Sequence, residues 1–178
     1  MCIILCAIFI PTQAQHLKFM GIPLTGTITQ FQQKLATKGV VQDKTASARA
    51  DYGTRIFKGP FAGSDATIVV WYDTNTKIVH GAKAYFTFYS PQSRDTKYNK
   101  LKSLLEEKYA DEITNTDQVD DHESFNIEVT DETGVTVLGF ISLYCMKSEL
   151  SYRDYTVHVE YQDYKNKLKN KNNLMDDL

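Results

Sequence analysis

Three long segments of the chain alternate apolar residues with polar or tyrosine residues, and this period of two limits the possible folds more than any other feature. In the segment 77–89, for example, Ala84 and Phe86 alternate with less apolar neighbours, and the segments 134–146 and 152–162 behave similarly. Successive side chains of a β-strand point to opposite faces of its sheet. The sequence therefore predicts a sheet with one apolar face and one mixed face.

Two other segments carry the signals of helices. Thr27–Gln30 matches a capping box, apolar residues then recur at helical spacing, and Gly39 provides a left-handed stop. We therefore predict a helix over 28–38. Ser90–Pro91 is a typical helix start and precedes an apolar stripe, which predicts a second helix over 93–109.

Each predicted helix is followed by three predicted strands, and an acidic connection at 111–123 separates the two sets. A chain of 178 residues with 42% apolar residues can bury one good core, and we place this single domain at residues 16–164. The order predicts an α+β fold, in which tandem helix-plus-three-strand units form one mainly antiparallel sheet with helices on one face. The strands are expected near residues 53–58, 65–72, 77–89, 123–130, 134–146 and 152–162.

The two predicted hairpins also align weakly at a constant offset, which indicates an internal repeat. The matched residues are Asp73 with Asp131, Val79 with Val137 and Gly81 with Gly139.

This element order resembles the beta-lactamase-inhibitor-protein-like architecture, which is built from tandem units of a helix and antiparallel strands. The opening stretch FMGIPLTGTITQFQQKL, at residues 19–35, is similar to the start of a group of uncharacterised small exported proteins of Gram-negative gut bacteria. The first resemblance implies a sheet face that binds proteins. The second implies a secreted or periplasmic location and no known activity.

The first residues of the chain have the features of an export signal. Residues 1–14 contain no charged side chain, Cys2–Ile10 is an apolar run, and Pro11–Ala14 resembles a cleavage region. The run is too short to span a bilayer, which takes roughly 20 apolar residues. We expect a signal peptide at 1–14 and a periplasmic or extracellular protein, with a buried N-terminal strand as the alternative.

Charge and the C-terminal sequence bear on possible partners. The formal net charge is -2, so no overall positive field would attract nucleic acid, and no membrane span is expected after leader cleavage. Residues 165–178 are polar and rich in lysine and asparagine, and are expected to form a solvated tail or a helix.

The chain lacks the spacings of common catalytic and metal sites, since no HExxH, GxSxG or CxxC occurs. Asp120–Glu123 is the most metal-like cluster, but consecutive residues of an extended chain point to alternate sides, so we expect a solvated acidic turn. Cys145 is expected to pack as a small hydrophobe, and His80 to lie hydrogen-bonded at the edge of the core. We predict no catalytic residue, no metal and no cofactor, and whether the chain is an enzyme stays open.

The mixed face of the predicted sheet is the best functional lead, because aromatic and charged side chains together are typical of protein interfaces. The first hypothesis is a secreted or periplasmic non-catalytic binding module that engages a protein partner through this open sheet face. The alternative is a small-molecule-binding protein or a cryptic hydrolase with a cleft near His80 or His158. The residues expected on the binding face are Lys83, Tyr85, Tyr89, Phe140, Tyr144, Met146, His158 and Glu160.

Overall fold

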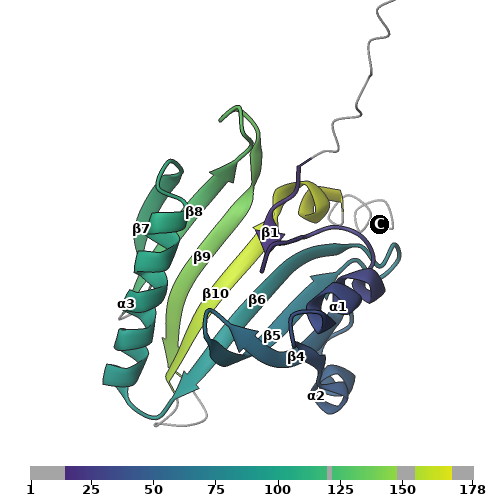
Figure 1. The fold of residues 1–178 in the computed structure, drawn as a ribbon, viewed down its shortest axis with the longest axis horizontal. Coiled ribbons are helices and arrows are strands. Elements are labelled where there is room, and N and C mark those ends of the chain that lie inside the picture. The colour runs from purple at the N-terminus through teal and green to yellow at the C-terminus, as the bar shows by residue number, and fades with distance from the viewer. Residues whose placement is uncertain (1–14, 120–121, 148–154, 170–178) are drawn as a thin grey trace, which may run out of the picture.

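The computed structural model describes residues 15–119, 122–147 and 155–169 (Figure 1). The expected signal peptide at 1–14 and two residues of the acidic cluster, Asp120 and Asp121, lie outside this range.

The described chain forms an α+β fold around one antiparallel sheet of eight strands. The strands follow one another across the sheet in the order β3-β4-β5-β6-β10-β9-β8-β7. A separate two-stranded sheet is formed by β1 (Lys18–Phe19) and β2 (Ile22–Pro23). The strands of the large sheet are β3 (Val41–Gln42), β4 (Thr54–Phe61), β5 (Ser64–Tyr72), β6 (Val79–Phe88), β7 (Ile113–Val119), β8 (His122–Thr130), β9 (Val137–Lys147) and β10 (Tyr155–Asp163).

The strand order is that of two similar halves placed side by side. The predicted order of a helix and three strands is present twice, and the last strands of the two halves, β6 and β10, pair at the centre of the sheet. Each half has in addition an edge strand, β3 or β7, between its helix and its first long strand. The segment 111–123, which we expect to be only a connection, therefore contains β7.

The two matched aspartates have the same local role in the two halves. Asp73 lies between β5 and β6, where its carboxylate accepts hydrogen bonds from the backbone amides of Asn75 and Thr76. Asp131 lies between β8 and β9, where its carboxylate accepts a hydrogen bond from the Thr133 amide. Both side chains stabilise a tight turn by satisfying its amides.

The helices pack on one side of the large sheet, and Figure 1 looks onto that side. Helix α1 (Ile28–Ala36) begins with the predicted capping box, in which the Thr27 hydroxyl accepts from the Gln30 amide and the Gln30 side chain accepts from the Thr27 amide. Helix α3 (Pro91–Lys108) begins at Ser90 as its N-cap and buries Tyr98, Leu101 and Leu105. A short helix α2 (Lys44–Arg49) follows β3, and residues 164–169 form a further helical segment.

The core lies between the helices and the apolar face of the sheet. Phe19 is fully buried, stacks on Phe61 with ring centroids 5.3 Å apart and meets the edge of Tyr161. The apolar alternation also predicts Val135 on this face, and that prediction is wrong. Val135 is 82% exposed, because β9 begins only at Val137 and Val135 belongs to the preceding turn.

A buried carboxylate connects the start of the described chain to its end. Asp163, at the end of β10, is completely buried and accepts hydrogen bonds from the Leu17 amide and the Asn166 amide. The Nδ1 atom of His16 lies 3.0 Å from the same carboxylate. Asn166 donates in turn to the carbonyl oxygen of Leu24. These bonds hold the N-terminal segment and the helical segment 164–169 against each other.

Among the helices that the structure describes, none has the length and apolar character that crossing a membrane requires.

Candidate functional site

The strand register places most of the predicted binding residues on one face, opposite to the face on which the helices pack. His158 on β10 stands across from Tyr85 on β6 and from Tyr144 on β9. Glu160 stands across from Lys83. We call this surface the open face, and it carries seven of the eight predicted residues: Lys83, Tyr85, Phe140, Tyr144, Met146, His158 and Glu160.

The centre of the open face is a stack of three rings from three neighbouring strands. The His158 ring lies 4.9 Å from the Tyr144 ring at an interplanar angle of 3°, and 5.4 Å from the Tyr85 ring at 21°. The imidazole is therefore held between two phenol rings and is only 7% exposed. Its Nε2 atom lies 2.7 Å from the Thr156 hydroxyl, whereas its Nδ1 atom is buried without a hydrogen-bond partner among the described residues.

Burial sets the protonation of the stack. Burial, together with the nearby charge of Lys83, lowers the pKa of His158 to about 4. Burial also raises the pKa of Tyr144, and the neighbouring charge of Glu160 adds to this. The Tyr144 hydroxyl accordingly stays protonated and donates a 3.0 Å hydrogen bond to Glu160. At neutral pH both rings are uncharged, and neither has a pKa suited to general acid–base catalysis.

More exposed side chains surround the stack. Phe140 is 39% exposed and Met146 is 49% exposed, both on β9. The Phe140 ring meets the edge of the Tyr164 ring with centroids 6.3 Å apart. Tyr89, the eighth predicted residue, lies one position beyond β6 and is 84% exposed, so it stands outside the sheet.

Trp71 also belongs to the open face and is not among the residues predicted there. It stands across from Gly81, and the Lys83 ammonium lies 5.5 Å from the centroid of its indole ring. The alternation of β5 contains the signal, because Ile68 and Val70 are fully buried and Trp71 has the opposite parity. The same parity argument that selects Tyr85 on β6 would have selected Trp71 on β5.

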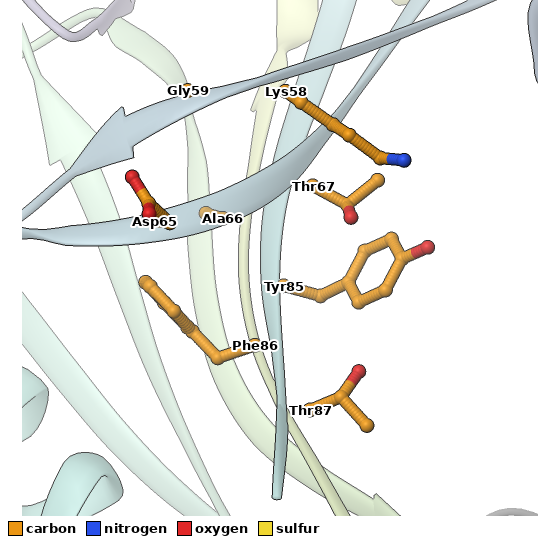
Figure 2. A pocket seen from close by; sticks show the side chains of 8 residues that line it. All are labelled: Lys58, Gly59, Asp65, Ala66, Thr67, Tyr85, Phe86 and Thr87. Atoms are coloured by element: carbon orange, nitrogen blue, oxygen red, sulfur yellow. The ribbon is translucent and has the colours of Figure 1, made fainter. Parts of the chain in front are cut away.

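A pocket of about 470 Å³ opens beside Tyr85, where β5 diverges from β6. The last residue pair between these strands is Thr67 with Tyr85, and β5 continues without β6 as its neighbour from there back to its start. Figure 2 shows Lys58, Thr67, Tyr85 and Thr87 pointing to one side of the strands. Phe86 points to the other side. The pocket is therefore an open notch in the sheet, and neither His80 nor His158 lines it.

His80 and Cys145 lie apart from the stack. A register shift between Trp71 and Tyr72 breaks the alternation around His80, which is half-buried, and burial lowers its pKa. Cys145 stands across from Val157 and so lies on the face opposite to His158, as the alternation predicts. Burial raises the pKa of the Cys145 thiol to about 11, so this cysteine is a thiol at neutral pH.

In the part of the chain that the structure describes, no group of three or more histidine, cysteine, aspartate or glutamate side chains is arranged to hold a metal ion.

Comparisons with known protein families, curated proteins and solved structures found no match for this chain. Its function is therefore inferred from its own residues.

Proposed function

We propose that this chain is a secreted or periplasmic binding module without catalytic activity, which engages a protein partner through the open face. The observation that carries the proposal is the ring stack of Tyr85, His158 and Tyr144, next to the exposed side chains of Phe140 and Met146. Aromatic residues and methionine are enriched at protein interfaces, and large side chains there supply most of the binding energy.

The rigidity of the stack supports a binding role. Its two tyrosine rings are held by neighbouring strands, and the Tyr144 hydroxyl is fixed by Glu160. Side chains that are ordered before binding lose little conformational entropy when a partner docks. Lys83 and Glu160 lie beside the stack as a cross-strand pair of opposite charge, which gives the surface polar groups that orient a partner.

The resemblance of the element order to the beta-lactamase-inhibitor-protein-like architecture supports the same use of the sheet. That resemblance implies a sheet face that binds proteins, and the open face is the one on which the helices do not pack. We propose an inhibitor-like role for the open face, in which the chain blocks or holds its partner without transforming it.

The test is an affinity capture from the culture medium and periplasm of the cells that produce the protein. Loss of a buried aromatic anchor costs on the order of 2 kcal/mol or more, so Tyr144→Ala is expected to weaken partner binding at least tenfold. Because Tyr144 also supports the sheet, the double variant Phe140→Ala/Met146→Ala removes exposed side chains and leaves the stack intact. The matched control is Leu104→Ala, which removes an exposed apolar side chain from α3.

The expected result is that wild type and the Leu104 variant retain the same protein and the open-face variants lose it. Equal recovery by all four chains would contradict the proposal, and so would the recovery of no protein by wild type.

The second candidate is a small-molecule-binding protein with a cleft near His158. The pocket favours it, because Tyr85 lines the pocket and also stacks on His158. This candidate expects a rise in melting temperature with a low-molecular-weight extract of the same cells, and no protein partner in the capture experiment. Thr87→Trp would fill the notch with a bulky side chain and abolish that rise.

A further inference from the structure

The strand β7 forms one edge of the large sheet and has the features of a strand that pairs with another chain. It runs from Ile113 to Val119 and pairs with β8 at every position, without a bulge. Its sequence, ITNTDQV, contains no lysine, proline or glycine. Proteins usually protect an exposed edge with such residues, with a bulge or with a covering segment, because a free edge offers unpaired amide and carbonyl groups.

The opposite edge of the same sheet is protected. There β3 is only two residues long, and α2 packs against the neighbouring strand β4. The Ser47 hydroxyl of α2 accepts a 2.9 Å hydrogen bond from the Ile56 amide and donates a 3.1 Å hydrogen bond to the Ile56 carbonyl. The Asp43 amide donates to that same carbonyl. The first half of the chain thus satisfies its edge backbone with its own groups.

The equivalent position in the second half has no such cover in the described ranges. Residues 114–117 are all exposed, and among the described residues only β8 forms hydrogen bonds with the backbone of these four residues. The Asp117 carboxylate accepts a hydrogen bond from the Asn126 side chain on β8, which turns it toward its own sheet. The two halves share their strand order, so β3 and β7 occupy equivalent edges of the sheet. In the described ranges, the two edges differ because only the one at β3 is covered.

We propose that β7 pairs antiparallel with β7 of a second copy of this chain, about a two-fold axis at Thr116. Thr116 is the midpoint of the strand, so this register pairs all seven residues. It places Asn115 opposite the partner's Asp117, an amide opposite a carboxylate. A register centred on Asp117 would instead place two carboxylates opposite each other, which is unfavourable.

The pairing has a consequence for the whole assembly. A two-fold axis in an antiparallel strand pair is perpendicular to the sheet, so both copies present the same face on the same side. Two eight-stranded sheets would join into one continuous sheet with both open faces on one side. Because β8 and β9 separate β7 from β10, the proposal does not depend on the proposed function of the ring stack.

The experiment measures mass by sedimentation equilibrium over protein concentrations from about 1 to 500 µM, since an edge contact of this size is expected to be weak. Wild type is expected to shift from monomer to dimer within this range. Thr116→Lys places two positive charges opposite each other and should weaken dimerisation at least tenfold. Asn115→Lys adds the same charge one residue away, opposite the partner's Asp117, and should leave dimerisation unchanged or strengthen it.

Mixing Thr116→Lys with Thr116→Glu should restore a dimer that neither variant forms alone. Only a contact that places residue 116 opposite itself gives this result. Unchanged circular dichroism spectra would show that the variants fold, as expected for exposed positions. A wild type that stays monomeric throughout, equal loss with both lysine variants, or no restored dimer in the mixture would each overturn the proposal.

Discussion

At the scale of single residues, His158 has both favourable and unfavourable contacts. Its ring packs well between Tyr85 and Tyr144, but its Nδ1 atom is buried without a partner among the described residues. A buried polar atom without a hydrogen bond costs roughly 1–3 kcal/mol of stability. Such a cost is typical of a residue that is kept for the shape and chemistry of a functional surface rather than for stability.

The replacement His158→Phe tests this account through its pH dependence. Above pH 6.5 the imidazole is neutral in both the folded and unfolded chain. Between pH 6.5 and 4 it gains a proton only in the unfolded chain, so the folded state loses stability as the pH falls. Wild type should therefore lose about 2 kcal/mol between pH 7 and pH 5 from this residue alone.

A phenylalanine ring in place of the imidazole would keep the stack and cannot titrate, so the variant should lose much less over the same interval. Urea unfolding at both pH values measures the difference. At pH 7 the variant should be at least as stable as wild type, because it removes the unpartnered Nδ1 and Thr156 still donates to the Met146 carbonyl. An identical loss in both proteins would contradict the assignment.

At the scale of elements, local patterns predicted the parts of the fold whose stabilising contacts are local. The capping box at Thr27 and the N-cap at Ser90 form as the sequence indicates, because their partners lie three residues away. The strand β7 was not predicted. Its residues 114–117 are exposed, and an edge strand with exposed side chains does not need the apolar alternation by which the other strands were recognised. Helix α2 escaped because it buries no residue and acts through the Ser47 hydroxyl.

The open face was predictable only in part. Alternation assigns Tyr85, Tyr144 and His158 to one face, strand by strand. It does not say which residue stands across from which, since that register is set by pairing between β6, β10 and β9. The ring stack and its shifted pKa values therefore needed the structure.

The repeated glycines Gly81 and Gly139 provide a test at this scale. Both stand across from the end of β10, where the backbone approaches closely. A Cβ at Gly139 would lie 2.1 Å from the Gln162 carbonyl oxygen, which cannot give way without moving the strand. A Cβ at Gly81 would lie 3.0 Å from the Trp71 ring and 3.2 Å from the Tyr161 carbonyl oxygen, so its neighbours need to shift by only a few tenths of an ångström. Gly139→Ala is therefore expected to cost about 3 kcal/mol and Gly81→Ala about 1 kcal/mol.

Thermal or urea unfolding of the two alanine variants measures these costs. Equal costs, or a larger cost at Gly81, would mean that the approach of β10 to β9 is looser than described.

At the scale of the whole molecule, the two halves depend on each other. The central pair β6 and β10 joins them into one sheet, and buried side chains of both halves form one core. The ends of the described chain add a second connection. His16 and Leu17 reach the carboxylate of Asp163, and Asn166 reaches the carbonyl of Leu24, so the first and last described segments stabilise each other.

These contacts bear on the proposed export signal. Leu17 is 2% exposed, and its amide donates to the fully buried Asp163. Cleavage after Ala14 or Gln15 would leave both contacts intact, whereas cleavage a few residues later would remove them. We therefore expect protein from the producing cells to begin at Gln15 or His16, as measured by intact mass. Retention of Met1 would contradict the export signal.

A matched pair of truncated chains separates the position of the cut from its structural cost. A chain that begins at Gln15 should melt at the same temperature as the processed protein. A chain that begins at Phe19 loses the buried Leu17 side chain, which should cost about 2–5 kcal/mol. It also leaves the buried Asp163 carboxylate without the donors of residues 16 and 17, which adds to that loss. Equal melting temperatures for the two chains would mean that residues 15–18 do not stabilise the fold. A leader could then be removed before Gln15 or before Phe19 without effect on stability.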